Sequence, residues 1–518
     1  MKFHLEGYLD FSKDLTFLKI SYLEDMVKEI NYLLFRKGVP AKKEGSRLTQ
    51  WEVKGNRLTV IIEGTTYLRP HDALLRLRAY LGEKLGKEYQ VGVREIFVKN
   101  YEISYKPEKT PKSGVEVKVP WVRKIIQKNG ELWIKLQNMN STAIENRYVE
   151  KILKRIDEKI SAQYVKRKKI ERVVKRGKSR LKRYKLQKDL TEEALNRGWV
   201  KEFPARGVWM FMPPMVALIK AIEELVIQRI AKPMKFKEML FPRLIPLEVQ
   251  YRKGQLSGIP NEMYWVCPPI SRDQKVFEEI SDYIEVTGGE VPENLLMKKL
   301  GPPIATLAYA QCESWYEIFR GEILDLDELP WKFMDRFGPT WRYEAGGLKG
   351  LERFTEFFRI EFTWIGRAVD VVQIRDEVLS RTLDLANKTM NLDWRVDAVA
   401  PVYLEHAGPG KEEEEELVKT YDLTVMLPFG TTNRTEKKEL EISNFSVHTD
   451  FYAKRFGWKE KNGRIVWSGC SGIGPFRWAY VFLARWGFNF DEWPEEIKKI
   501  IKKKYGKMPE TLKLVSWP

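Results

Sequence analysis

The sequence predicts an α+β protein with two or more domains. The chain has 518 residues, more than one small hydrophobic core usually accommodates. Short strand-like segments alternate with segments whose apolar residues recur every three or four positions, as in helices. Hydrophobic residues at 43% and charged residues at 31% are typical of a globular protein. No run of about 20 apolar residues exists, so no membrane span is expected. The start of the chain lacks the apolar centre of a signal peptide.

The order of elements follows from periodicity and turn residues. In chain order we expect a strand over 1–10, a helix over 15–37, a hairpin over 47–64, a helix over 71–87, strands between 91 and 136, and helices over 141–188. Pro213 and Pro214 then open an amphipathic helix through Ile230, because proline suits the first turn of a helix. Alternating short strands and helices continue from there to the end of the chain.

Positive charge is concentrated in one segment. The formal net charge is +18, and Lys151–Lys188 alone carries 17 Lys or Arg against three acidic residues. This excess indicates a polyanionic partner. A solvated helix face is the plainer interpretation, but the concentration and the share of arginine favour contact with nucleic acid or a basic linker.

Cysteine usage indicates a reducing compartment. The three cysteines, Cys267, Cys312 and Cys470, cannot all pair within one chain. We therefore expect a cytoplasmic protein whose thiols are buried, reactive or bound to a metal.

A glycine-rich hairpin carries the most informative chemistry. Arg342 and Glu344 lie two apart and share one face of a strand. Glycines between 346 and 350 let the chain turn back, and Phe357, Arg359 and Glu361 share a face of the return strand. Cations, an aromatic plane and carboxylates directed at one cavity suit a nucleoside triphosphate held beside a second small substrate.

Three segments in the correct order resemble the motifs of class II aminoacyl-tRNA synthetases. They are Lys235–Glu238 with Phe241-Pro242 for motif 1, Arg342 to Phe357 for motif 2, and Gly472–Arg477 opening the helix 478–486 for motif 3. In that family motif 1 forms a dimer interface. The resemblance therefore implies a homodimer and a catalytic domain built on an antiparallel sheet flanked by helices.

The resemblance also implies how ATP is bound. Arg342 would hold the α-phosphate and the incoming carboxylate through two parallel hydrogen bonds, and Glu344 would accept from the adenine amino group. Phe357 and Arg477 would sandwich the base, and Arg353 would reach the γ-phosphate. Arg342 and Arg477 are accordingly expected as the catalytic pair. Upstream of motif 3, Glu441 would hold Mg²⁺ against the phosphates.

Further segments resemble the atypical, methanogen-type seryl-tRNA synthetases. They are 307–317, 359–366 and 467–474. That family binds one zinc ion per subunit in its serine pocket through two cysteines and a glutamate, and the matching residues are Cys312, Glu361 and Cys470. Three ligands leave one position open for the serine amine. Asn444, on the strand that carries Glu441, is assigned to serine as well. Cys267 matches no role and is expected to be structural.

The implied organisation has three parts. Residues 1–170 would form an α/β tRNA-binding domain with a helix-capped sheet, 171–210 a basic linker, and 211–518 the catalytic domain with an inserted segment around 370–425. The expected partners are ATP, serine, tRNA-Ser and tRNA-Sec. A loop over 401–416 would close over serine, although no serine-contacting residue in it can be matched.

Rival functions remain open at this stage. A threonine-type synthetase would use histidine ligands for its metal, and no histidine occupies the three matched positions. A ligase that loads amino acids onto carrier proteins would lack a tRNA-binding domain. An RNA-binding regulator with a degenerate core would have lost the motif residues, and Arg342, Glu344, Phe357, Glu441 and Arg477 are all present.

Overall fold

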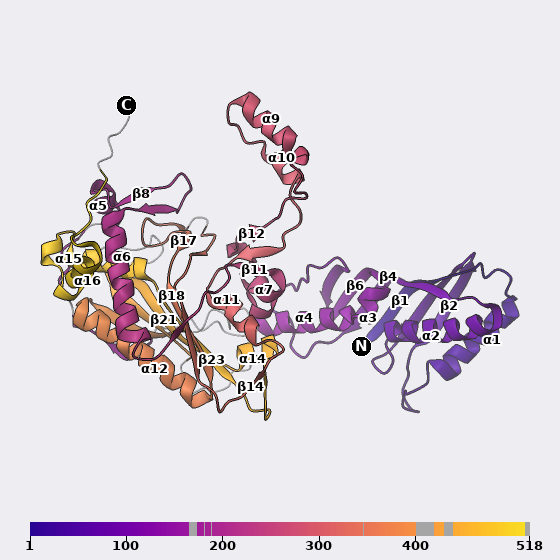
Figure 1. The fold of residues 1–518 in the computed structure, drawn as a ribbon. Coiled ribbons are helices and arrows are strands. Elements are labelled where there is room, and N and C mark those ends of the chain that lie inside the picture. The colour runs from indigo at the N-terminus through magenta and orange to yellow at the C-terminus, as the bar shows by residue number, and fades with distance from the viewer. Residues whose placement is uncertain are drawn as a thin grey trace. The chain divides into compact units, whose positions relative to one another are not determined.

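The computed structural model describes residues 1–164, 173–180, 182–187, 189–344, 347–399, 419–428 and 439–512. The chain divides into two compact units, Met1–Arg167 and Lys168–Pro518 (Figure 1). Gly346 and the expected serine-closing loop over 401–416 lie outside the described residues, as does part of the basic segment 151–188. No described helix is long and apolar enough to cross a membrane.

Unit 1 is built on a six-stranded antiparallel sheet in the order β2-β3-β1-β4-β6-β5. Its strands are β1 (Lys2–Phe11), β2 (Arg47–Lys54), β3 (Arg57–Gly64), β4 (Val93–Tyr105), β5 (Val122–Lys128) and β6 (Glu131–Asn140). On β1 the alternate residues Phe3, Leu5, Gly7 and Leu9 are buried while His4, Glu6 and Tyr8 between them are more exposed, which gives the sheet one apolar face. The predicted hairpin over 47–64 is confirmed as β2 and β3, which turn at Gly55.

Helices cover the apolar face of this sheet. They are α1 (Ile20–Glu29), which continues into a π-helical turn at Ile30–Leu34, α2 (Pro70–Tyr89), α3 (Ser141–Glu145) and α4 (Tyr148–Ala162). Leu74 and Leu77 of α2 and Ile156 of α4 are fully buried in one core with the strands. The helix-capped sheet is therefore confirmed. The predicted helix over 15–37 begins only at Ile20.

Unit 2 contains an eight-stranded sheet in the order β10-β15-β18-β23-β21-β20-β19-β7. Its strands are β7 (Val173–Lys178), β10 (Lys237–Glu238), β15 (Trp331–Asp335), β18 (Ile360–Gly366), β19 (Trp394–Val399), β20 (Thr420–Met426), β21 (Glu439–Thr449) and β23 (Trp467–Ile473). Only β10 and β15 pair in parallel, and the other neighbours are antiparallel. The expected antiparallel sheet flanked by helices is thus confirmed.

Short strands add small sheets around the large one. They are β8 (Val200–Glu202) with β9 (Trp209–Phe211), β11 (Leu244–Pro246) with β13 (Ala305–Leu307) and β12 (Trp265–Val266), β14 (Ile323–Leu324) with β22 (Lys459–Glu460), and β16 (Thr340–Trp341) with β17 (Glu356–Phe357). The β16–β17 pair is the base of the predicted motif 2 hairpin.

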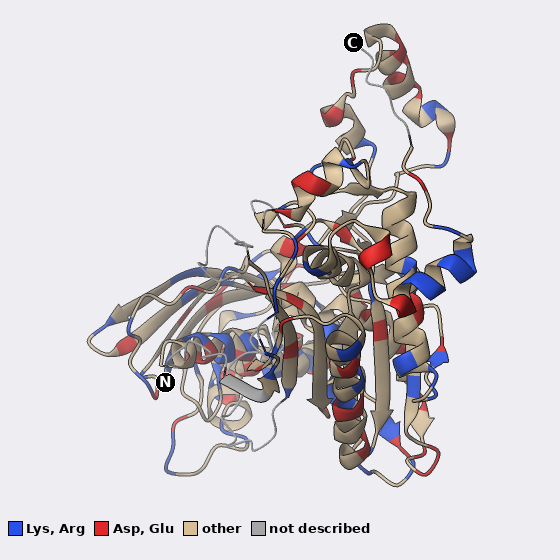
Figure 2. Cartoon of the chain, turned by 90° about the vertical axis from the view of Figure 1, so that its left-hand side faces the viewer, with Lys and Arg blue, Asp and Glu red and all other residues tan. Residues whose placement is uncertain are grey.

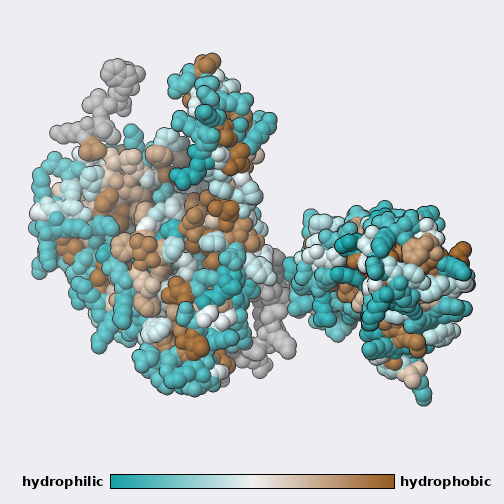
Figure 3. Space-filling model, turned by 45° about the vertical axis from the view of Figure 1, so that its right-hand side comes forward, coloured by the Kyte–Doolittle hydropathy of each residue, from teal (hydrophilic) through white to brown (hydrophobic). Residues whose placement is uncertain are grey.

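The helices of unit 2 are α5 (Leu190–Asn196), α6 (Pro213–Val226), α7 (Leu247–Lys253), α8 (Gln255–Gly258), α9 (Glu278–Thr287), α10 (Glu293–Lys298), α11 (Cys312–Trp315), α12 (Ala368–Asp384), α14 (Phe451–Phe456), α15 (Pro475–Trp486) and α16 (Glu495–Tyr505). Helices α9 and α10 project from the rest of the unit (Figure 1). They leave Val286, Val291 and Met297 exposed, and the hydropathy view shows brown patches on this projection (Figure 3).

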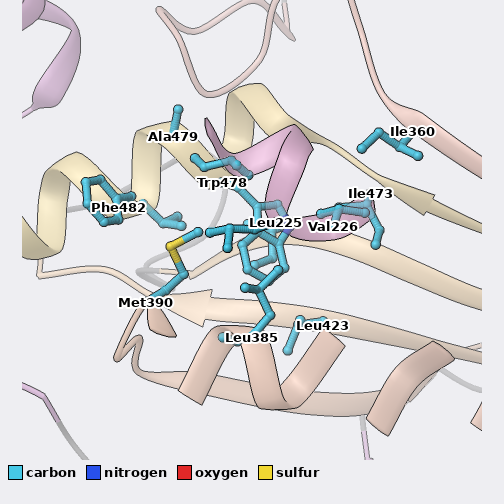
Figure 4. Packing of buried hydrophobic residues seen from close by; sticks show 14 of the residues in the cluster. Leu225, Val226, Ile360, Leu385, Met390, Leu423, Ile473, Trp478, Ala479 and Phe482 are labelled. Atoms are coloured by element: carbon cyan, nitrogen blue, oxygen red, sulfur yellow. The ribbon is translucent and has the colours of Figure 1, made fainter. Parts of the chain in front are cut away.

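The main core of unit 2 lies between one face of the large sheet and helices α6, α12 and α15. Trp478 and Phe482 of α15 pack with Leu225 of α6 (Figure 4). They also pack with Leu385 and Met390, which follow α12 in the chain. Trp364 of β18 is fully buried on this face, and its indole N–H donates to Val371 O at 3.1 Å.

The segment after unit 1 differs from the prediction. Helices were expected over 141–188, but Val173–Lys178 forms β7, which pairs with β19 at the edge of the sheet. The pairing partner lies more than 200 residues later, so local periodicity could not reveal it. In the predicted linker 171–210, Tyr184, Leu190 and Trp199 are buried in the core of unit 2.

The expected insertion around 370–425 contains α12, β19 and β20, and these elements belong to the large sheet and its helical cover.

Basic and acidic positions are mixed over the helices and strands (Figure 2).

Candidate active site

Strand register brings residues from three sequence segments to one face of the large sheet. On β18 the alternation turns Phe362 and Trp364 toward the helical core and Glu361 to the opposite face. Glu361 pairs with Gly472 of β23, which in turn pairs with Asn444 of β21. Paired residues of neighbouring strands point to the same face. The same register places Cys470 beside Thr363 and Ser446.

Cys312 reaches this face from the first turn of α11. Its neighbour Glu313 is fully buried and accepts from the backbone N–H groups of Tyr309 at 3.2 Å and Ala310 at 3.0 Å. Gln250 Nε2 donates to the same carboxylate at 3.1 Å. These bonds fix the corner between β13 and α11. Burial raises the pKa of Glu313 to about 7.

Cys312, Glu361 and Cys470 form a cluster whose Sγ and carboxylate oxygen atoms all lie within 4.8 Å of one another. Cys312 and Glu361 are buried, and no cysteine of the chain is in a disulfide. Glu361 Oε2 is buried and makes no aligned hydrogen bond among the described residues, although it forms an ion pair with Arg359. Two thiols and a buried carboxylate at this separation form a suitable set of ligands for zinc.

Two cationic side chains, Lys253 and Arg359, contact the cluster. Lys253 Nζ donates to Cys312 Sγ at 3.1 Å and lies 4.6 Å and 4.5 Å from the ring centres of Tyr316 and Tyr452. Arg359 Nε lies 3.1 Å from Glu361 Oε2. A hydrogen bond with Cys470, together with Lys253, holds the pKa of the Cys312 thiol well below its usual range. Burial outweighs Arg359 and raises the pKa of Glu361 to about 8.

A pocket adjoins this cluster and has a volume of about 710 Å³ with its open mouth included. All six residues predicted to bind ATP line it, together with Asn444; the six are Arg342, Glu344, Arg353, Phe357, Glu441 and Arg477. Arg359 and Gly472 line it too, so the two sites share a wall. A Cβ at Gly472 would lie 3.3 Å from both Asn444 Oδ1 and Glu361 Oε2, which explains why a glycine stands there.

The arginines of the pocket are held in different ways. The Arg342 guanidinium lies 4.3 Å from the centre of the Tyr309 ring and 5.3 Å from that of Phe357, and its Nε is buried without an acceptor among the described residues. Arg353 forms an ion pair with Glu344. Arg477 donates from Nη1 to the backbone oxygen of Glu441 at 2.7 Å, and burial lowers the pKa of its guanidinium.

Several residues of the site were not found from the sequence. Tyr309 lies under Arg342, and Lys253 contacts Cys312. His448 Nε2 lies 3.4 Å from Cys470 Sγ. Phe358 lines the pocket next to Phe357, although strict strand alternation would separate the two rings. The break between β17 and β18 at 358–359 allows both to face it.

Comparison with known proteins agrees with this geometry. A tRNA-binding domain family matches residues 1–158. The type-2 serine–tRNA ligases of Methanopyrus kandleri and Methanocaldococcus jannaschii are 35% and 36% identical to this chain, over 100% of it and 99% of each relative. The chain belongs to the type-2 serine–tRNA ligase family.

A solved structure supports the same assignment for the fold. The crystal structure of M. kandleri SerRS in complex with A. aeolicus tRNASec matches with a TM-score of 0.87 at 34% identity, over 100% of this chain and 99% of that chain. The expected class II architecture and serine–tRNA ligase activity are thereby confirmed. As a type-2 serine–tRNA ligase, the protein is an ATP-dependent ligase, and none of these relatives supports the threonine-type, carrier-protein or regulator interpretations.

The buried position of Arg477 leads to a prediction. Arg477→Ala should raise KM for ATP in serine-dependent ATP–pyrophosphate exchange by about 10- to 100-fold, because the expected cation–π contact with the adenine would be lost. Filter binding should show unchanged affinity for tRNA. Arg381→Ala, on α12 outside the pocket, serves as the control and should leave both quantities unchanged. Loss of tRNA binding in Arg477→Ala would indicate misfolding of the variant. It would contradict the assignment of Arg477 to the ATP pocket alone.

Proposed function

We propose that the two adjoining pockets divide the substrates of the ligase between them. ATP occupies the pocket lined by the motif residues, and serine occupies the space between that pocket and the Cys312–Glu361–Cys470 cluster. The observation that carries this proposal is the shared wall formed by Arg359, Asn444 and Gly472. It would bring a carboxylate and an α-phosphate together.

In this arrangement the serine carboxylate attacks the α-phosphorus and pyrophosphate leaves. Such chemistry depends on positioning and charge neutralisation more than on acid–base groups. Arg342, whose Nε has no acceptor among the described residues, is suited to bind the carboxylate and the α-phosphate. Phe357 and Arg477 bind the adenine between them, Glu344 accepts from its amino group, and Arg353 neutralises the γ-phosphate. Transfer to the 3′ end of tRNA follows.

Mg²⁺ belongs with the ATP phosphates in this proposal. Glu441 lines the ATP pocket, and its backbone oxygen is already used by Arg477. The carboxylate is then the group of Glu441 that remains for a cation, and carboxylate oxygen is the ligand type that Mg²⁺ favours.

The serine pocket would hold one zinc ion on Cys312, Glu361 and Cys470. Zinc supplies an open coordination position for a neutral amine. The residues fit this role, because two thiols and a buried carboxylate oxygen without a hydrogen bond converge within 4.8 Å. The hydrogen bond with Cys470, together with Lys253, lowers the pKa of Cys312 and so favours the thiolate, which is the form that binds metal. Asn444 and Arg359 orient serine from the ATP side. Rejection of threonine depends on pocket size and hydroxyl contacts, because serine and threonine share the amine; one methyl group alone is worth only about 1–3 kcal/mol.

The cysteines allow a matched test of the zinc site. Cys312→Ala should reduce bound zinc from about one per chain to near none and lower serine-dependent exchange by about 100-fold or more, because a ligand is removed. Cys267→Ala, at a half-buried cysteine outside the cluster, should keep zinc and activity. Elemental analysis and exchange kinetics measure the two quantities. A Cys312→Ala protein with normal exchange and no metal would contradict the pocket assignment.

The proposed RNA partners are tRNA-Ser and tRNA-Sec. Residues 1–158 match a tRNA-binding domain, and the M. kandleri relative was crystallised with tRNASec. The sheet and helices of unit 1 would grip the RNA by shape and phosphate contacts.

Aminoacylation of transcripts tests this choice. Both tRNA-Ser and tRNA-Sec should accept labelled serine, and a tRNA-Pro transcript should not. The KM for tRNA should rise steeply with salt, since phosphate contacts release counterions. Serylation of tRNA-Ser alone would refute the tRNA-Sec part of the proposal.

We also propose a cytoplasmic homodimer formed through motif 1. The segment after α6 leaves Leu240 68% and Leu244 51% exposed next to β10, which is more apolar surface than a free edge usually presents. The free cysteines are compatible with a reducing cytoplasm.

Leu240→Asp should shift the dimer toward monomer, because it would place a charge in an apolar interface. Light scattering should give twice the mass of one chain for the natural protein and a lower, concentration-dependent mass for the variant. Ile323→Asp, at another exposed apolar position, is the control. A natural protein with the mass of one chain would rule out the dimer.

A further inference from the structure

A buried carboxyl at the edge of the ATP pocket has no role in the proposed chemistry. Glu352 is only 2% exposed, lines the pocket and immediately precedes Arg353. An acidic side chain next to a triphosphate site is unfavourable for the substrate, and its burial is unfavourable for the protein. A compensating structural contact is therefore expected.

The contact is made with the motif 3 helix. Tyr480 of α15 donates its hydroxyl to Glu352 Oε1 at 2.8 Å, and Tyr480 is almost fully buried. Tyr480 lies three residues after Arg477, so the two side chains leave neighbouring positions on the same side of the helix. Glu352 thus joins the loop that carries Arg353 to the helix that carries Arg477.

Backbone hydrogen bonds close the turn over residues 349–353. Lys349 N–H donates to Arg353 O at 2.8 Å and Arg353 N–H donates to Lys349 O at 3.0 Å, which closes a tight turn around Glu352. Gly350 takes a φ of +45°, and a Cβ there would lie 2.3 Å from Thr191 Oγ1. Motion at Glu352 would therefore be passed on to Arg353.

Residues at the start of α5 support the turn as well. Leu351 N–H donates to Thr191 Oγ1 at 3.1 Å, and Asp189 in turn accepts from Thr191 N–H at 2.8 Å. The turn 349–353 is accordingly held between α5 and α15.

We infer that Glu352 is a positioning residue: through its hydrogen bond from Tyr480 it fixes Arg353 of the motif 2 loop relative to Arg477 of α15. The inference rests on the proposed roles of these two arginines in binding ATP. The backbone of Arg353 is then in place before the triphosphate enters, and only its side chain exchanges the ion pair with Glu344 for the phosphate, which lowers the ordering cost of binding. The link would act on ATP and leave serine, bound on the far side of Arg359, largely unaffected.

The charged and titratable groups around Glu352 fit this role. Lys349 Nζ lies 3.4 Å from Oε2, and Asp189 and Tyr480 face the same carboxyl. Burial, with a contribution from Asp189, raises the pKa of Glu352 to about 7. An acceptor oxygen is present at Oε1 in either protonation state, and the amide oxygen of glutamine would supply it too.

Three variants test the link in the full-length protein. Glu352→Ala and Tyr480→Phe should each raise KM for ATP in the exchange assay by about tenfold and leave KM for serine within about twofold. Glu352→Gln should restore KM for ATP to near its natural value, because an acceptor is returned. The double variant should be no worse than either single one, since both break the same contact.

Controls separate positioning from folding. Glu223 is another buried glutamate of unit 2, paired with Arg336 and Lys220 and absent from the pocket lining. Glu223→Ala should lower the melting temperature without changing KM for ATP. The inference is overturned if Glu352→Ala also lowers the melting temperature without changing KM for ATP. It is overturned as well if Glu352→Gln raises KM for ATP as much as Glu352→Ala does. Tyr480→Phe removes a single hydroxyl and keeps the test valid if Glu352→Ala does not fold.

Arg353→Ala distinguishes the inference from the function on which it rests. If Arg353→Ala raises KM for ATP and Glu352→Ala does not, the positioning role alone is wrong. If neither changes KM for ATP, the proposed role of Arg353 is wrong and the link has nothing to position.

Discussion

The pairing register of β18, β23 and β21 is the constraint on which the rest of the site depends. A strand exposes alternate residues to opposite faces, so a slip of one residue would exchange the two faces completely. In the observed register Phe362 and Trp364 enter the core, and Glu361 faces Gly472 and Asn444. Burial of Trp364 therefore helps to hold Glu361 in place. The free energy of core packing thus maintains the arrangement of Glu361 relative to Gly472 and Asn444.

Charge balance is the second requirement of this face. Ionised thiols and carboxylates that are buried together repel one another. Each of them also loses its hydration free energy on burial. Lys253 and Arg359 supply positive charge within hydrogen-bonding distance of Cys312 and Glu361. The raised pKa of Glu361, about 8, shows that burial is not fully offset. A divalent cation at the cluster would complete the compensation, which is the physical reason for the zinc proposal.

From the sequence alone one can name residues that the fold brings to one pocket, but not the residues that support them. Arg342, Glu344, Arg353, Phe357, Glu441 and Arg477 were named from motif resemblance, and all of them line one pocket. The residues that hold them, among them Glu352, Tyr480 and Thr191, belong to no motif. Each is an ordinary residue type whose role depends on a partner more than 120 positions away. The strand at Val173–Lys178 was mistaken for helix for the same reason, since its partner β19 is equally remote.

By itself, the sequence determined the α+β class, the type-2 serine–tRNA ligase resemblance and the identity of the chemical groups. These depend on residue types in a fixed local order, which a single chain displays directly. The tertiary structure decided which groups share a wall, which carboxyl remains without a hydrogen bond and which cation faces which thiol. These are properties of long-range strand pairing and burial, because a pKa or an unsatisfied oxygen depends on neighbours that local sequence does not specify.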